Sequence, residues 1–179
     1  MNRSRSANVV VLGLAALALG QGFFLIPKGT TSAQDMVHGL QVGADLSALE
    51  AVRESGEPPD LSNGQPTLLL AFDSECSHSE AVTDLWRSLT ESRHEDLRIV
   101  LLSPEPLETA KTYAIAHGWS GEVWAVDSAE TGSLGFALTQ RTPWAFLLNG
   151  NGVLVSDGHG SEAMGMIGSP THQTLGASG

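Results

Sequence analysis

The chain has 179 residues, with 20 acidic and 9 basic side chains and a net charge of −11. This length accommodates one ordinary domain, and the acidic balance argues against nucleic acid or an anionic lipid surface as a partner. A single cysteine excludes an intramolecular disulfide, and with it the class of small secreted domains that disulfides hold together.

An apolar run from Val9 to Ile26 follows a short stretch that carries Arg3 and Arg5 and no acidic residue. At about 1.5 Å per residue, the run is just long enough to cross a thin hydrocarbon core. We expect residues 1–28 to form an uncleaved signal anchor; a cleaved signal peptide and a buried core helix are the alternatives. Because the positive charges precede the span, the rest of the chain is expected on the extracytoplasmic (periplasmic) side of the cell membrane, held by a single pass.

Residues 29–66 are expected to form a linker and an N-terminal extension of the domain. Within them, Leu46, Leu49 and Val52 have helical spacing and predict a helix over 45–56. The stretch "EPPDLSNGQP" that follows is rich in turn residues, which excludes regular structure there. A flexible arm is the alternative interpretation of this whole section.

Strands and helices alternate over residues 67–158, the expected core. An apolar run at 67–72 predicts a strand buried on both faces, and residues 77–92 carry an apolar stripe at helical spacing. The remaining expected elements are a strand at 97–103, a helix at 106–118, a strand at 122–127, a short helix or irregular stretch at 129–138, and two antiparallel strands around "NGNG". This order predicts an α/β layer fold with a mixed central sheet and flanking helices.

The last segment, residues 159–179, is rich in Gly and Ser and is expected to be a flexible C-terminal tail. It offers at most a weak helix around 161–167. The six histidines and the one cysteine of the chain do not have the spacing of metal ligands, so we expect neither a metal nor another cofactor.

The lone Cys76 lies in "AFDSECSHSEAV", between a predicted strand and a predicted helix. A thiolate is the nucleophilic form of cysteine, and a helix N-terminus or a protonated His78 would lower the pKa of the thiol. Asp73, Glu75 and Glu80 would raise that pKa, because like charge disfavours a thiolate. The sequence leaves the sign of the shift open, and a small buried residue is the alternative role for Cys76.

The strand, cysteine and helix, followed downstream by "RTPWAFLLNGNGVLV", resemble the thioredoxin-like superfamily. "LQVGA" and "GQPTLLLAFDSECSHSEAV" resemble its membrane-anchored TlpA/MauD-like branch, and the resemblance extends over residues 40–158. It implies a three-layer thioredoxin-like fold outside the cytoplasm and chemistry of thiol–disulfide exchange.

In this resemblance Cys76 corresponds to the first cysteine of C-x-x-C, and Ser79 stands at the position of the second. His78 is similar to the histidine in the C-P-H-C motif of periplasmic disulfide oxidases. Thr142 and Pro143 correspond to the cis-proline segment, which implies a cis peptide between them and a contact with substrate. The chain departs from the pattern of thioredoxins at their buried acid, where it has Leu70, and at the tryptophan before the cysteine, where it has Glu75.

We therefore expect monothiol exchange through Cys76, with His78 and Ser79 as the other catalytic candidates. Without a second thiol, a mixed disulfide has to be released by glutathione or by a thiol of a partner protein. The expected partners are accordingly thiols or disulfides of exported proteins, and glutathione. The alternative is a redox-inactive thioredoxin-like module for interaction or assembly, because the resolving cysteine and the buried acid are both missing.

Overall fold

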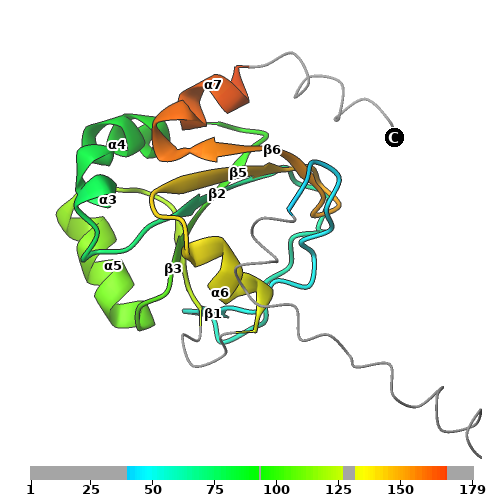
Figure 1. Ribbon diagram of the computed structural model, residues 1–179, viewed down its shortest axis with the longest axis horizontal. Coiled ribbons are helices and arrows are strands. Elements are labelled where there is room, and N and C mark those ends of the chain that lie inside the picture. The colour runs from blue at the N-terminus through cyan, green and yellow to red at the C-terminus, as the bar shows by residue number, and fades with distance from the viewer. Residues whose placement is uncertain (1–39, 93, 127–131, 169–179) are drawn as a thin grey trace, which may run out of the picture. The chain divides into compact units, whose positions relative to one another are not determined.

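The computed structural model describes residues 40–92, 94–126 and 132–168, and Figure 1 shows how their strands and helices are arranged. The predicted signal anchor at residues 1–28 lies outside the described residues. Within the described part of the chain, no helix is long and apolar enough to cross a membrane. The anchor therefore stays a prediction.

A six-stranded mixed sheet forms the centre of the fold, in the order β1-β4-β3-β2-β5-β6. Its strands are β1 (Val52–Arg53), β2 (Thr67–Ala71), β3 (Arg98–Ser103), β4 (Glu122–Ala125), β5 (Trp144–Leu148) and β6 (Leu154–His159). β2, β3 and β4 run parallel, whereas β5 is antiparallel to β2, β6 to β5 and β1 to β4. The parallel strands and the closing hairpin predicted from the sequence are thereby confirmed.

Helices cover both faces of this sheet (Figure 1). They are α3 (Ser77–Ala81), α4 (Thr83–Glu91), α5 (Leu107–Ala116), α6 (Leu134–Thr139) and α7 (Ala163–Ile167), with a short 3-10 helix η1 (Gly160–Glu162) before α7. Because successive residues of a strand point to opposite faces, β2 contributes to two hydrophobic clusters. Leu68 and Leu70 pack with residues of α4, α5 and α7, whereas Leu69 and Ala71 pack with residues of α6 and of the segment before β2.

The helix predicted over 77–92 is divided into α3 and α4 at Val82, which ends the first and begins the second. α4 buries Trp86 completely, and the indole Nε1 of Trp86 donates a 2.9 Å hydrogen bond to the carbonyl of Gly160. A Cβ on Gly160 would lie 2.7 Å from Trp86 and 3.0 Å from Pro143, so only glycine fits there. This contact ties α4 to the end of the hairpin and to Pro143.

The helix predicted over 45–56 does not form. Leu46 and Leu49 are buried as expected, but they pack against the sheet from a chain of turns. The amide of Leu46 donates to the carbonyl of Gly152, and Val52 in β1 pairs with Ala125 in β4. Tertiary hydrogen bonds therefore replace the helical ones. Tertiary pairing thus outweighs a weak local preference, as it often does for short segments.

The packed domain extends beyond both ends of the expected core at 67–158. Before it, Leu61 is fully buried in the cluster that contains Leu46 and Leu49. After it, η1 and α7 confirm the weak helix expected around 161–167, and Met166 joins the other cluster. Both extensions cover apolar faces of the sheet that would otherwise face water.

The burial of Leu46 predicts that the segment before β2 contributes to the stability of the domain. Leu46 is 1% exposed, and Leu46→Ala should lower the free energy of unfolding by about 3 kcal/mol, as large-to-small changes in a core do. Urea denaturation followed by tryptophan fluorescence measures this. Val42 in the same segment is 68% exposed, so Val42→Ala is the control and should change stability by less than about 0.5 kcal/mol. Equal, small effects of both variants would show that the segment is not part of the core.

Candidate functional site

Cys76 stands between β2 and α3, at the N-cap of the helix. Its backbone is extended (φ −87°, ψ 113°), and its carbonyl accepts a 2.9 Å hydrogen bond from the amide of Ser79. The amide of Cys76 donates to the carbonyl of Asp73, which closes a turn after the strand. The thiol is thus held at the carboxyl end of a central strand, and it is partly exposed.

The sulfur of Cys76 has one neighbour close in the sequence, His78, and one distant neighbour, Thr142. Its thiol donates to the carbonyl oxygen of Thr142 over 3.5 Å, and Nδ1 of His78 lies 4.0 Å from Sγ. The Thr142–Pro143 peptide is cis, as the family resemblance implies. The sulfur of Cys76 therefore contacts two other predicted site residues, His78 and Thr142, and Pro143 directly follows Thr142 in the chain.

The surroundings of Cys76 lower the pKa of its thiol below the ordinary value for cysteine. Partial burial acts in the opposite direction and raises the pKa, because it removes water from the thiolate. Hydrogen bonds from the backbone amides of Ser79 and His78, together with the side chains of Thr142 and His78, favour the thiolate and outweigh burial. The sequence left the direction of the pKa shift open, and the structure gives it as a lowering.

Ser79 forms hydrogen bonds with the backbone of the loop between β2 and α3. Its side chain is fully buried, and its hydroxyl accepts a 3.2 Å hydrogen bond from the amide of Asp73. The amide of Ser79 also bonds to the carbonyl of Cys76. Ser79 thus closes the turn that carries Cys76.

Glu105, which the sequence interpretation did not include, anchors the same loop from the next strand. Its carboxylate accepts a 3.0 Å hydrogen bond from the amide of Ser74, a further one from the Ser74 hydroxyl, and one from the Ser103 hydroxyl at 3.2 Å. Because β2 and β3 are parallel, the segments after them meet at one edge of the sheet. The only sign of this role in the sequence is that Glu105, a polar residue, follows β3 closely.

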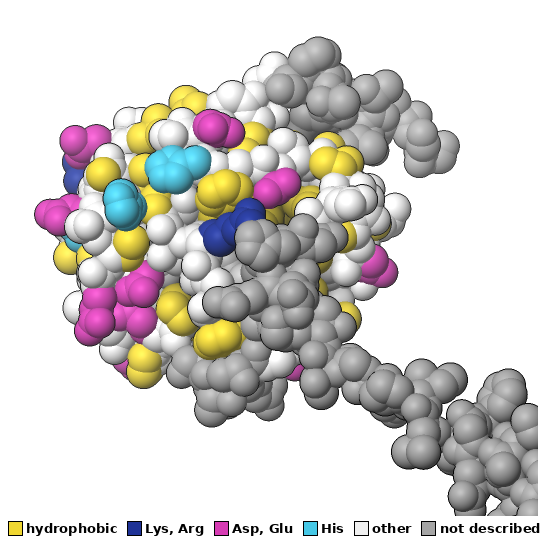
Figure 2. All heavy atoms as spheres, in the orientation of Figure 1, with side chains coloured by type: hydrophobic (Ala, Val, Ile, Leu, Met, Phe, Trp, Pro, Cys, Tyr) yellow, Lys and Arg dark blue, Asp and Glu magenta, His cyan; other side chains and the backbone are white. Residues whose placement is uncertain are grey.

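A pocket of about 290 Å³ lies beside the cis peptide; we call it the Pro143 pocket. Its lining consists of His78, Arg141, Thr142, Pro143, Trp144 and His159. Cys76 does not line it, but two of its lining residues, His78 and Thr142, contact the sulfur of Cys76. Figure 2 shows one face of the molecule, on which histidine side chains lie close to a Lys or Arg side chain, with a group of acidic side chains to one side. The sequence interpretation missed Arg141 and His159 as members of the site, although Arg141 directly precedes Thr142. His159 lies opposite Trp144 in the β5–β6 pairing.

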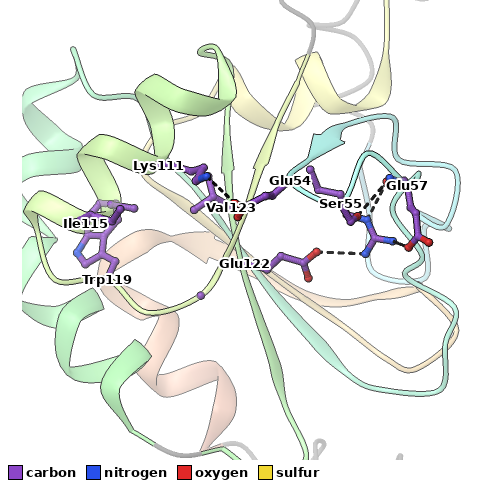
Figure 3. Close-up of a pocket in the computed structure, with 11 residues that line it drawn as sticks. Glu54, Ser55, Glu57, Lys111, Ile115, Trp119, Glu122 and Val123 are labelled. Atoms are coloured by element: carbon purple, nitrogen blue, oxygen red, sulfur yellow. Dashed lines mark hydrogen bonds and ion pairs between the residues drawn. The ribbon is translucent and has the colours of Figure 1, made fainter.

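A second cavity, of about 300 Å³, lies between α5 and the segment after β1 (Figure 3). Its charged side chains are bound to one another: Lys111 to Glu54 at 3.1 Å, and Arg53 to Glu57 at 2.9 Å. Neither Cys76 nor the two residues in contact with its sulfur, His78 and Thr142, line this second cavity. In the described ranges, no group of three His, Cys, Asp or Glu side chains could hold a metal ion. The surroundings of Cys76 are therefore the candidate site.

Solved structures with the same fold are similar to this chain at low identity. The thioredoxin domain of a thiol-disulfide oxidoreductase from Bacteroides vulgatus is 12% identical with a TM-score of 0.55, over 76% of this chain and 99% of that one. A chain named thiol:disulfide interchange protein DsbE, from Chlorobium tepidum, is 15% identical with a TM-score of 0.57, over 79% and 100%. A thio-disulfide isomerase from Thermus thermophilus is 16% identical with a TM-score of 0.55, over 78% and 99%.

No family model and no curated protein matches the sequence. At identities of 12 to 16%, the likeness to solved structures establishes the fold, while the activity has to be argued from the site itself. The mixed six-stranded sheet with flanking helices agrees with that likeness. The chain has the thioredoxin-like α/β fold.

Proposed function

We propose that this chain is a thioredoxin-like protein of the TlpA/MauD-like type that carries out thiol–disulfide exchange through Cys76 as a monothiol. In this proposal residues 1–28 anchor it in the cell membrane, and the domain lies on the periplasmic side. The observation that carries the proposal is the thiol of Cys76, with its lowered pKa, in contact with the segment of the cis-proline. A helix end alone would be weak support; the meeting of two distant segments at one sulfur is stronger.

In the first step the thiolate of Cys76 attacks one sulfur of a disulfide. A bond forms between Cys76 Sγ and that sulfur, the original S–S bond breaks, and the other sulfur leaves as a thiolate. In the second step an external thiolate, from glutathione or from an exported protein, attacks the mixed disulfide and releases Cys76 as a thiolate. Electrons are conserved at each step, and one disulfide replaces another.

The neighbouring residues have separate roles in this proposal. A hydrogen bond from His78 Nδ1 stabilises the thiolate of Cys76, and so do the amides at the start of α3. Thr142 and Pro143 form the wall against which the substrate disulfide lies. Ser79 positions the loop, since its hydroxyl is far too weak an acid to resolve a mixed disulfide.

A redox-inactive module for interaction or assembly is the second candidate. It is favoured by the absence of any second cysteine from the sequence and by the buried hydroxyl of Ser79 at the position where a resolving thiol would stand. In that case the thioredoxin-like surface would bind a partner without bond exchange. The reactivity of Cys76 separates the two candidates.

The lowered pKa of Cys76 predicts a reactive thiol at moderate pH. Only the thiolate is alkylated, so the rate of reaction with iodoacetamide should rise as the pH increases. The pH at the midpoint of this rise should be lower for the folded chain than for the same chain in denaturant, where a free cysteine titrates at about 8.5. His78→Ala should raise this midpoint, because it removes a group that favours the thiolate. A midpoint in the folded chain at or above that of the denatured chain would contradict the assignment.

The same shift has a consequence for stability, with a defined sign. The folded chain binds the proton of Cys76 more weakly than the unfolded chain does. This group therefore favours folding above the pKa of the unfolded thiol, and its contribution is lost as the pH falls through the lower pKa of the folded state.

Mixed-disulfide formation tests the exchange itself. Oxidised glutathione should form an adduct on the folded chain, and reduced glutathione should release it; intact-mass spectrometry follows both steps. Cys76→Ser is the control and should form no adduct, because the sequence has no other cysteine. If Cys76 is trapped neither by glutathione nor by any exported protein, the exchange function is wrong and the interaction module becomes the better account.

A resolving thiol introduced at position 79 should change the lifetime of that adduct. In Ser79→Cys the new thiol lies in the first turn of α3, and it should displace glutathione to form an internal disulfide, so that the adduct decays faster than in the natural chain. Ser79→Ala controls for the lost hydrogen bond from Asp73, which should cost about 1 to 3 kcal/mol of stability. An adduct equally long-lived in Ser79→Cys would show that position 79 cannot reach the sulfur of Cys76.

A further inference from the structure

The Pro143 pocket differs in charge from the rest of the chain. The net charge is −11, yet among the described residues those that line this pocket include no Asp or Glu. Three of them, His78, Arg141 and His159, are nitrogen bases that can donate hydrogen bonds or carry positive charge. The carboxylates of Asp73, Glu75 and Glu80 flank Cys76 in the sequence, and Glu105 bonds to the loop that carries it. The lining of the Pro143 pocket, with Arg141 and without a carboxylate, contrasts with these acidic neighbours of Cys76.

Arg141 is held in the pocket by the ring of Trp144. The centre of its guanidinium lies 5.3 Å from the centroid of that ring, a cation–π contact. Trp144 is oriented in turn by a 3.0 Å hydrogen bond from its Nε1 to the carboxylate of Asp157. A planar guanidinium placed in this way suits a carboxylate, which it can bind through two parallel hydrogen bonds.

His159 adds a hydrogen-bond donor from the opposite strand. Its ring meets the Trp144 ring edge to face at 6.4 Å, and its Nδ1 accepts a 3.2 Å hydrogen bond from the amide of Ser161. Since Nδ1 is an acceptor, the neutral ring carries its proton on Nε2. The lining of the pocket therefore combines two hydrogen-bond donors, Arg141 and His159, with the apolar side chains of Pro143 and Trp144.

We propose that the Pro143 pocket selects small disulfides that carry a carboxylate, with that carboxylate on Arg141 and one sulfur at Cys76. This inference rests on the proposed exchange at Cys76 and names its substrate class. A volume of about 290 Å³ suits a low-molecular-weight ligand better than a folded partner. The reaction is the exchange described above: Cys76 Sγ bonds to one sulfur of the ligand, and the other half leaves as a carboxylate-bearing thiolate.

Three disulfides of similar size and different charge test this selection. They are 3,3′-dithiodipropionate with two negative charges, 2-hydroxyethyl disulfide with none, and cystamine with two positive charges. The rate of mixed-disulfide formation with each, measured on the full chain at one pH, is divided by the rate with the neutral thiol N-acetylcysteine methylamide. This division removes the intrinsic reactivity of each disulfide.

We expect the normalised rate to be highest for the dianion and lowest for cystamine. Arg141→Gln should lower the ratio of the dianion rate to the neutral rate about fivefold, equivalent to about 1 kcal/mol, because one partly exposed charge contact is lost. Arg141→Lys keeps the charge and should retain most of the preference. Lys111→Gln, in the cavity next to α5, makes the same change in net charge and should leave the ratio unchanged.

The outcomes separate this inference from the function on which it rests. If Cys76 reacts with none of the three disulfides, the proposed exchange is wrong. If it reacts with all three, but the ratio in Arg141→Gln equals that of the natural chain, exchange stands and the selection of carboxylates is overturned. A dependence on Arg141 that appears only with a disulfide inside an acidic peptide would identify a polypeptide ligand and would also overturn it. Circular dichroism of Arg141→Gln checks that the fold is intact.

Discussion

The antiparallel pairing of β2 with β5 decides where chemistry can take place in this chain. Ala71 lies opposite Trp144, so the loop after β2 and the segment before β5 meet at one edge of the sheet. Cys76 ends the loop after β2, and Thr142 lies two residues before β5, so the sulfur of Cys76 comes within 3.5 Å of the carbonyl oxygen of Thr142. A slip of one residue would turn the side chains of β2 to the wrong clusters on both faces, so the register is strongly specified.

Polar contacts hold the cysteine loop in place on that frame. Ser79 bonds to the amide of Asp73 from within the loop, and Glu105 bonds to Ser74 from the adjacent strand. The amides at the start of α3 are thereby directed at the sulfur, and their hydrogen bonds, together with the side chains of Thr142 and His78, outweigh the effect of burial on the pKa of Cys76. A thiolate is thus favoured in an acidic chain by local donors, since exposed carboxylates at a distance are screened by water and salt.

Much of the fold follows from patterns that are local in the sequence. The continuous apolar run at 67–72 and the run at 97–103 predict buried parallel strands, and both form. The helix predicted over 45–56 fails because its apolar residues serve the sheet from turns, and Val52 joins a strand instead. Spacing in a short segment indicates which residues are buried more safely than it indicates the backbone conformation that buries them.

The candidate site divides in the same way. The position of Cys76 after a strand and the cis-proline segment could be interpreted from the sequence, because each depends on adjacent residues or on a family pattern. The sign of the pKa shift of Cys76, the anchoring by Glu105 and the contribution of Arg141 and His159 to the Pro143 pocket could not be interpreted from the sequence. These features depend on contacts between segments that are far apart in the chain, such as Cys76 and Thr142, which are separated by 66 positions. Such contacts form only when the sheet brings its strands together.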